Sequence, residues 1–534
     1  MITYDNSAIL VVWKHTDYLP QRGRYMPVKR IKVIYLLLLT MLFLTNCSVN
    51  PVTGQNEFLL MSKQQEITLG EKNYSPSRQA QGGDYYLDSE LQSYVAGVGK
   101  KLATYSAQPD LPFEFVVLNN SVPNAWALPG GKIAINRGLL VQLRDEAQLA
   151  AVLSHEIVHA VARHGASQMS RGTLLSLGVM AVGVSAKEKE NEEIVGLASQ
   201  FGTAAWMAKY SRDDELEADY YGMDYMAQAG YEPEGAVELQ ETFVSFSKDK
   251  ATSFLSGLFA SHPPSMRRVE ANRIKAKTLP SGDRGRTRFQ AAIRQLKKDE
   301  LAYEAAEKAK KALKKNDPRG ALSSLDKAVD IQPDEFSFWV LRGKAWKILG
   351  DTGRAERAFT TSIRKNPNHY SAYLERGVLL YDNGDKINGI ADIKRSHALL
   401  PTAEGSYYLG NAAMEQKNYQ RAKAYFEVGA KSSENVGSRS RAKLLILNQR
   451  LNPERYIRIS QIQNRDGGMV IRLTNLASVS IGNLQIQITD GVAARELRLG
   501  ETILPSESVN IQPERHALLN RPFLVKILKA TVVE

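Results

Sequence analysis

The spacing of apolar residues changes along the chain, and each pattern predicts a different kind of secondary structure. Residues 64–102 place apolar side chains three and four positions apart, as an amphipathic helix does. Residues 113–120 and 132–137 alternate apolar and polar side chains like strands, on either side of the segment NAWALPGG. A second helical segment begins near Asp145. Together these patterns predict a mainly α-helical domain with a small antiparallel sheet.

An internal period of 34 residues appears after about residue 290. Proline recurs at this interval, and so do an Arg-Gly pair and a single glycine. The positions are Pro333, Pro367 and Pro401, Arg342-Gly343 and Arg376-Gly377, and Gly350 and Gly384. This is the length of the tetratricopeptide repeat. The period predicts an α-helical tetratricopeptide solenoid over 290–440, with three full repeats and a flanking helical pair.

The C-terminal part alternates again, in short runs separated by Gly, Asn, Asp and Pro. The runs are RYIRISQI, MVIRLTNL, LQIQITD and FLVKILKATVV. They predict a small all-β domain over 451–534, built like a sandwich. The expected fold is therefore multidomain, with the mainly α domain over 47–275, the solenoid, and this β domain.

An Ala- and Gly-rich apolar stretch, interrupted by KEKENEE, occupies residues 173–205. Neither apolar half reaches the roughly 20 residues of a membrane-spanning helix. The stretch therefore predicts a lid or a helical hairpin over a site in the first domain.

Near the N-terminus, basic residues precede an apolar run at 33–44 that ends close to Cys47. The run is too short to span a membrane but fits the core of a signal peptide. Leu44-Thr45-Asn46-Cys47 resembles a bacterial lipobox, in which the cysteine is lipidated and becomes the mature N-terminus. Residues 1–46 are then an upstream extension and lipoprotein signal peptide, with Met26 as the natural start. An uncleaved anchor or a free buried cysteine is the alternative.

Composition narrows the chemistry. Of 534 residues, 43% are hydrophobic, which is enough for several globular cores. Residues 271–450 carry 35 Lys and Arg against 20 Asp and Glu, an excess that we interpret as a solvated helical surface. The single cysteine excludes an internal disulfide and a zinc site built on several thiolates. Any metal must therefore be held by histidine and carboxylate.

The densest candidate chemistry lies in VLSHEIVHAVARH, which contains an HExxH pattern. On a helix, His155 and His159 project about 40° apart, so both imidazoles reach one metal ion. Glu156 lies on the flank of that face, where it can reach a water without being a ligand. His164 falls about half a turn out of phase on an unbroken helix and is not expected to bind the same ion. The alternative is a core helix that happens to carry histidines.

The third ligand must come from elsewhere, and a carboxylate is common in HExxH sites. The segment SRDDELEADYYG at 211–222 is helical in pattern. Glu215 and Asp219 share one face of it, whereas Glu217 points elsewhere. Glu215 is therefore the candidate ligand, and Asp219 the candidate partner for the far nitrogen of a ligating histidine. A solvated acidic helix face is the alternative.

Five segments, in chain order, carry a family resemblance: NPVTG, NAWALPGGKIAINRGLL, HEIVHAVARH, SRDDELEAD and SHPPSMRRVE. From about residue 50 to 275 the chain resembles the HtpX/BepA/Oma-type zinc metallopeptidases, relatives of the CaaX prenyl-protein endopeptidases. With its repeats it most resembles the β-barrel assembly-enhancing protease group. The resemblance implies a zincin-type domain with Zn²⁺ on His155, His159 and Glu215, and Glu156 as general base.

Other roles follow from the resemblance alone. His262 and Arg268 lie in the HPP element, where they would stabilise the transition state, or where His262 would block the fourth zinc position, or where both would only anchor a loop. Asn124, Trp126 and Leu128 lie in the edge strand that would bind an extended substrate.

The sequence thus predicts a zinc endopeptidase of the periplasm, lipid-anchored through Cys47 and sorted to the outer membrane. Its expected substrates are unfolded or misassembled envelope proteins, and its repeats would contact outer-membrane assembly machinery. The competing hypothesis is a non-proteolytic tetratricopeptide chaperone or scaffold. Nucleic acid is not an expected partner, because the signal peptide directs the chain out of the cytoplasm.

Overall fold

The computed structural model describes residues 47–181, 210–248, 256–463, 469–489, 494–512 and 524–533. The predicted signal peptide at 1–46 lies outside the described residues, as does the predicted lid apart from its beginning at 173–181. None of the helices in the described ranges has the length and apolar character needed to cross a membrane.

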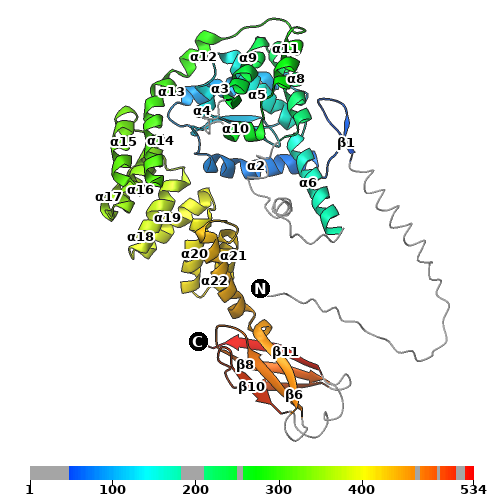
Figure 1. Ribbon diagram of the computed structural model, residues 1–534, viewed down its shortest axis with the longest axis vertical. Coiled ribbons are helices and arrows are strands. Elements are labelled where there is room, and N and C mark those ends of the chain that lie inside the picture. Colours follow the sequence, from blue (N-terminus) through cyan, green and yellow to red (C-terminus); the bar gives the residue numbers. More distant parts are fainter. Residues whose placement is uncertain are drawn as a thin grey trace, which may run out of the picture.

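Three parts follow one another in chain order along the molecule's long axis, with the N-terminal domain at one end and the β domain at the other (Figure 1). The N-terminal domain is mainly helical, as predicted. Its principal helices are α2 (Lys63–Ala80), α3 (Ser89–Ala103), α4 (Arg137–Leu140), α5 (Glu146–Val161), α6 (His164–Ala181), α8 (Arg212–Gln228), α9 (Glu234–Lys248), α10 (Ser256–Ser261), α11 (Met266–Ala276), α12 (Arg286–Ala292) and α13 (Arg294–Lys298). A short hairpin of β1 (Cys47–Val49) and β2 (Asn56–Phe58) precedes them.

The small sheet is mixed, so the prediction of an antiparallel sheet is wrong in one pairing. Its strands are β3 (Glu114–Leu118), β4 (Ala125–Leu128) and β5 (Lys132–Asn136), in the order β3-β5-β4. β4 and β5 form an antiparallel hairpin, but β3 pairs with β5 in parallel. The reason is the strand order: after β3 the chain passes over one strand position and forms β4 at the opposite edge. It then turns back and forms β5 between β3 and β4, in the same direction as β3. β4 is consequently an edge strand of the described sheet.

Helix α5 lies at the centre of the N-terminal domain, and every one of its residues is buried. Asp145 caps its N-terminus by accepting a hydrogen bond from the backbone N–H of Gln148 at 3.0 Å. The helix ends at Val161, because Arg163 adopts a left-handed backbone conformation with φ of 63°. The unbroken helix assumed from Asp145 to His164 is therefore wrong, and His164 instead begins α6 in a new direction.

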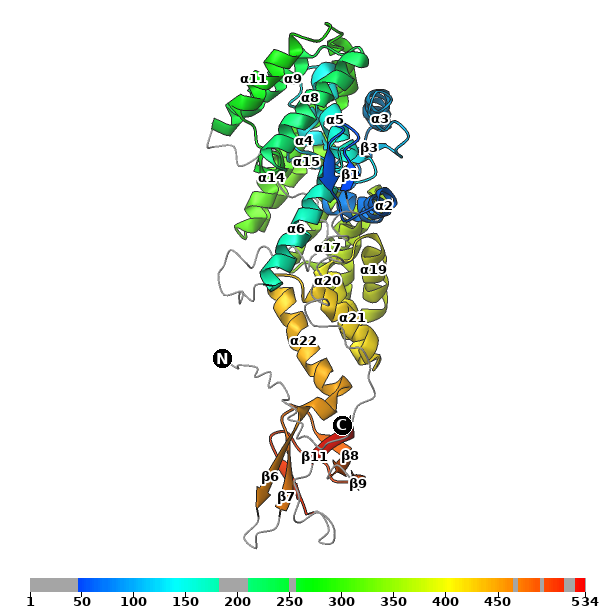
Figure 2. The same ribbon diagram turned by 90° about the vertical axis from the view of Figure 1, so that its right-hand side faces the viewer.

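The predicted helical solenoid is confirmed. Four antiparallel helix pairs are stacked, and a longer helix closes the stack. They are α14 (Glu300–Lys314) with α15 (Pro318–Ile331), α16 (Phe336–Ile348) with α17 (Thr352–Lys365), α18 (Tyr370–Asp382) with α19 (Lys386–Leu399), α20 (Ala403–Glu415) with α21 (Tyr419–Gly429), and α22 (Asn435–Leu451). Figure 2 shows α22 leading from the stack into the β domain.

The first repeats are docked on the N-terminal domain through a buried polar network. Glu335, in the turn before α16, is fully buried and accepts hydrogen bonds from Asn119 Nδ2 at 2.9 Å and from the hydroxyl of Tyr303 at 3.0 Å. The Arg137 guanidinium lies 3.2 Å from the centre of the Tyr303 ring and donates to Asn119. One continuous apolar core includes both Ile133 of β5 and residues of α14 to α16. The repeats and the N-terminal domain therefore share packing as well as hydrogen bonds.

His369, in the next repeat turn, is buried against the N-terminal domain. The residue is 5% exposed, and a Cβ on Gly83 of the N-terminal domain would lie only 2.8 Å from its ring. Burial lowers the pKa of His369 to about 4. At pH values between this pKa and the ordinary value of about 6.5, the unfolded chain binds a proton on this histidine but the folded chain does not. The free energy of unfolding therefore falls as the pH is lowered through this range.

We expect the free energy of unfolding to drop by roughly 2 kcal/mol between pH 7 and pH 5 from this residue alone. His369→Gln should remove that part of the pH dependence, as measured by urea unfolding at the two pH values. An unchanged pH dependence in the variant would assign the effect to other groups.

The C-terminal domain is a sandwich of two three-stranded antiparallel sheets, as predicted. The strands are β6 (Ile457–Gln463), β7 (Met469–Asn475), β8 (Ile481–Thr489), β9 (Ala494–Leu499), β10 (Ser508–Ile511) and β11 (Leu524–Val532). The sheets have the orders β10-β7-β6 and β11-β8-β9. Apolar residues of both, such as Leu473 and Ile486, are fully buried in one common core.

Candidate metal centre

The two histidines of α5 direct their Nε2 atoms at the same point. His155 Nε2 and His159 Nε2 are 3.0 Å apart, and Glu215 Oε1 of α8 is 3.4 Å from His159 Nε2. His262, just after α10, contributes Nδ1 as a fourth atom, and all four atoms lie within 4.8 Å of one another. Each of these four atoms directs a lone pair at the common point when it carries no proton. Such a convergence of acceptors is what a metal ion neutralises, and two imidazoles with one carboxylate form a common zinc donor set.

α8 supplies the carboxylates because it crosses closely over α5. Gly222 allows this approach, since a Cβ at that position would lie 3.2 Å from the backbone nitrogen of His155. Asp219 Oδ1 lies 2.9 Å from His155 Nδ1, so the far nitrogen of that ring donates to a carboxylate and Nε2 is left as the acceptor. The spacing of Glu215 and Asp219 places them as the sequence predicted, one toward the metal point and one behind the histidine.

Arg268 of α11 binds both of these carboxylates. Its Nη1 is 2.6 Å from Glu215 Oε2. Its Nε is 2.7 Å from Asp219 Oδ2, and its Nη2 is 2.7 Å from Asp219 Oδ1. The residue is 4% exposed. The guanidinium is thus engaged by the acids of α8, and this geometry favours a role in positioning them over direct contact with a substrate carbonyl.

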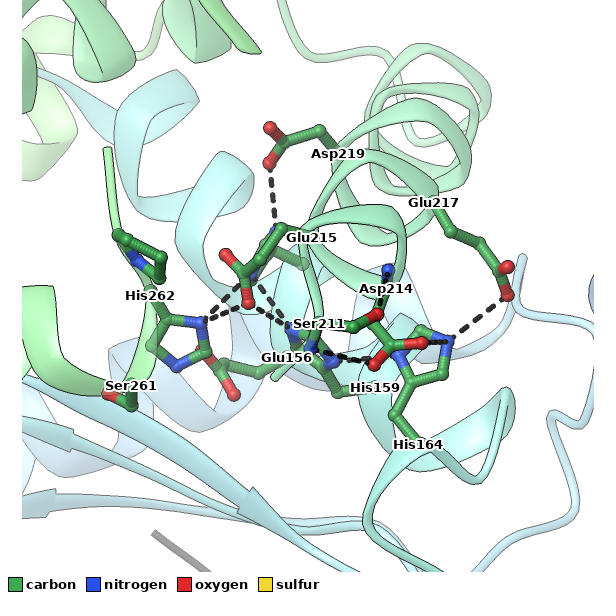
Figure 3. Close-up of polar contacts among 12 residues, drawn as sticks. Glu156, His159, His164, Ser211, Asp214, Glu215, Glu217, Asp219, Ser261 and His262 are labelled. Carbon is green, nitrogen blue, oxygen red and sulfur yellow. Dashed lines mark hydrogen bonds and ion pairs between the residues drawn. The ribbon is translucent and has the colours of Figure 1, made fainter. Parts of the chain in front are cut away.

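Glu156 and His262 face each other across the site. His262 Nε2 is 3.5 Å from Glu156 Oε1, while His262 Nδ1 is 3.0 Å from Glu215 Oε1 (Figure 3). Both side chains are buried. Glu156 lies next to the metal point without belonging to the group of four converging atoms. His262 does belong to it, and its ring lies between the ligand Glu215 and the base candidate Glu156.

Burial and local charge shift the pKa values in opposite directions. Burial raises the pKa of Glu156, and the charges of His262 and His155 only partly offset it. Burial lowers the pKa of His159 well below its usual value, which keeps the imidazole neutral and able to bind a metal. For Glu215, the opposing effect of burial is overcome by the charges of His262 and Arg268, so its pKa lies well below the usual range. The ligand carboxylate is therefore ionised while Glu156 is the more basic acid.

Two contacts of the ligand His159 were missed by the sequence reasoning. His164 Nδ1 lies 2.8 Å from His159 Nδ1, because the left-handed Arg163 turns the chain back toward α5. The ring of Tyr210 stacks on that of His159, with centroids 3.8 Å apart. Tyr210 directly precedes the acidic segment in the sequence, but its spacing from the HExxH pattern gives no signal of this stacking. His164 is not among the converging metal ligands, as expected. The reason is not its position on the same helix but its contact with the far nitrogen of His159.

Strand β4 runs beside α5, and its side chains are buried. Trp126 and Leu128 are 6% and 3% exposed and pack in a separate cluster with Tyr74 of α2. Asn124, just before the strand, is also buried. These three predicted substrate residues therefore direct their side chains into the protein, and all four residues of the strand are buried. A mostly apolar cavity of about 40 Å³ lies next to Glu156 on the side of α8 and α9.

Comparison with known proteins agrees with this geometry. Residues 89–275 match the model of peptidase family M48, and residues 349–388 match a tetratricopeptide repeat. The mitochondrial metalloendopeptidase OMA1 of Schizosaccharomyces pombe is 31% identical over 232 residues, which are 42% of this chain and 66% of that protein. The same-named protein of Saccharomyces cerevisiae is 29% identical over 246 residues, 43% of this chain and 69% of the relative. The β-barrel assembly-enhancing protease of Escherichia coli K12 is 27% identical over 208 residues, 36% of this chain and 40% of that protein.

Proposed function

Residues 89–275 belong to peptidase family M48. We therefore propose that this zinc metalloendopeptidase hydrolyses peptide bonds of unfolded or misassembled envelope proteins. We propose further that its repeats recruit these substrates or the outer-membrane assembly machinery. The observation that carries the proposal is the convergence of His155, His159 and Glu215 beside Glu156. A metal site with an adjacent general base is what amide hydrolysis requires.

The residues divide the reaction between them. Zinc, when bound, lowers the pKa of a water towards about 7. Glu156 would accept the proton of the water that attacks the scissile carbonyl and would return a proton to the leaving amine. The raised pKa of Glu156 suits both transfers, because the carboxylate takes up a proton near neutral pH more readily than an exposed one. Asp219 holds His155 in the tautomer that leaves Nε2 free for the metal.

The position of His262 supports an inhibited resting state. Catalytic zinc needs an open coordination position, whereas Nδ1 of His262 lies with the three ligand atoms. The same ring also reaches Glu156. We therefore propose that His262 would be a fourth ligand of bound zinc at rest and that substrate binding requires the loop after α10 to withdraw.

His262→Ala should raise the rate of peptide hydrolysis, because the fourth position and Glu156 both become accessible to water. Initial rates on an unfolded substrate measure this, with His397→Ala, a histidine in the distant helix α19, as the matched control. A large loss of activity would instead assign His262 to transition-state stabilisation, and no change would exclude both roles.

The substrate class is inferred from β4. Its outer edge has no strand partner in the described sheet, and we propose that an extended peptide adds there through main-chain hydrogen bonds once the residues that bury this strand withdraw. Such binding tolerates many side chains but requires an extended segment. Unfolded chains and exposed loops satisfy this requirement, whereas a folded barrel does not.

The location is inferred from the N-terminal pattern. One relative is mitochondrial by name and another is named for β-barrel assembly, so the relatives alone leave the compartment open. The signal-peptide pattern and the lipobox at Cys47 support a lipid-anchored periplasmic enzyme, attached to the outer membrane. Cys47→Ala should therefore leave membranes and enter the soluble fraction. Continued sedimentation of this variant with membranes would contradict the lipid anchor.

One assay tests the whole proposal. The full chain is incubated with a purified outer-membrane barrel protein, either unfolded or folded in detergent, with and without a zinc chelator. We expect cleavage of the unfolded form only, and no cleavage with the chelator. If the zinc-loaded protein captures the unfolded barrel but cuts nothing, including after His262→Ala, the scaffold hypothesis replaces the enzyme.

A further inference from the structure

We propose that Asn50 is a positioning residue for the zinc site, acting on the ligand His159 through Glu217 and His164. The inference rests on the zinc site of the proposed peptidase but concerns a residue more than 100 positions before His155 in the sequence. Three hydrogen bonds in series connect the N-terminal hairpin to the metal point.

The first link joins the ligand to His164. If Nε2 of His159 binds the metal, its proton is on Nδ1, which donates to His164 Nδ1 at 2.8 Å. His164 then carries its own proton on Nε2. That N–H faces Glu217 Oε1 at 3.2 Å, so a carboxylate accepts it on the far side of α8 from His262 (Figure 3). His164 is 2% exposed, so it is shielded from bulk solvent at these contacts.

The second link joins Glu217 to Asn50. The Asn50 amide donates to Glu217 Oε1 at 3.1 Å and to Glu57 Oε1 at 2.8 Å. Its carbonyl oxygen accepts from the backbone N–H of Val52 at 2.9 Å, within the tight turn of NPVTG. Asn50 is 2% exposed. The turn therefore fixes the orientation of the amide, and the amide in turn fixes the oxygen that receives the proton of His164.

Arg163 reinforces the same connection. It is the residue whose left-handed conformation brings His164 toward His159. Its guanidinium donates to Ser48 Oγ at 2.7 Å and to the carbonyl oxygen of Met61 at 2.7 Å, and it pairs with the buried Glu66. The segment from 48 to 66 thus holds both the backbone reversal at Arg163 and the acceptor for His164. Because Cys47 is three residues before Asn50, the predicted lipid anchor and the metal site share this short hairpin.

The test uses a substitution that alters one link and keeps the turn. Asn50→Asp retains the oxygen that accepts from Val52 but replaces the donor to Glu217 with a second acidic oxygen. Asn56→Asp adds the same charge to an exposed position of the same hairpin and is the matched control. Zinc affinity is measured on the full chain by competition with a chelator, and thermal unfolding of the zinc-free proteins reports the fold.

Altered partners behind metal ligands typically cost about 10- to 100-fold in affinity. We expect about 10-fold weaker zinc binding for His164→Ala, about 3-fold or more for Asn50→Asp, and no change for Asn56→Asp. His164→Asn keeps an acceptor for His159 but has no reach to Glu217, so adding Asn50→Asp to it should cause no further loss.

Two results would overturn the inference: wild-type zinc affinity in Asn50→Asp, or an equal effect of Asn50→Asp in the wild-type and His164→Asn backgrounds. The His164→Asn background also distinguishes the proposed effect from misfolding, because a general loss of structure caused by Asn50→Asp would weaken zinc binding in both backgrounds. Since zinc binding is measured without a substrate, the inference can hold in a protein that cuts nothing. Failure of the proposed peptidase function is therefore a separate outcome.

Discussion

Glu156→Gln is expected to abolish peptide hydrolysis while zinc remains bound. The amide cannot accept the proton of the attacking water, and general acid–base catalysis contributes about 10²- to 10⁴-fold to such rates. Zinc binding should persist because Glu156 contributes none of the four converging atoms. The substitution preserves volume at a position that is 2% exposed, so folding should be retained as well.

The measurement is kcat on an unfolded substrate, with zinc content determined for each protein. Glu146→Gln is the matched control, since Glu146 is a buried glutamate at the other end of the same helix and pairs with Arg288. It should keep its activity even if it loses some stability. Residual activity of Glu156→Gln near that of the wild type would mean that another group accepts the proton.

Arg268→Ala is expected to destabilise the N-terminal domain by about 3–5 kcal/mol, because it leaves the buried carboxylates of Glu215 and Asp219 without their cation. The effect should be largest in zinc-free protein, where no metal ion adds to the charge of His262 beside Glu215. Arg268→Lys keeps the charge but not the two-pronged contact with Asp219, so it should restore only part of the stability.

Urea unfolding of the zinc-free proteins measures the effect. Arg267→Ala, at the exposed neighbouring position, is the control and should change stability by less than about 0.5 kcal/mol. If Arg268→Ala unfolds like the wild type and loses only kcat, Arg268 acts on the transition state and the positioning role is wrong.

The metal ligands could be predicted from the sequence because a helix converts spacing into direction. His155 and His159 are four apart on α5, and Glu215 and Asp219 are four apart on α8, so each pair shares a face whatever the rest of the fold. The repeat array was predictable for a related reason. A 34-residue period in several residue types leaves few alternatives to stacked helix pairs.

The features that could not be predicted depend on contacts between distant segments or on single backbone angles. Nothing local requires Arg163 to adopt a positive φ, yet that angle decides where His164 lies. The contact between Asn50 and Glu217 joins residues separated by 167 positions. The parallel pairing of β3 with β5 likewise follows from strand order, which alternation of apolar residues does not reveal.

The docking of the repeats through Glu335 has a consequence for how this protein can be divided. Cutting the chain between α11 and α12 would remove the acceptor of Asn119 and the aromatic ring under Arg137, and would expose the part of the core that β5 shares with α14 to α16. We therefore expect the N-terminal domain to be less stable alone than in the full chain.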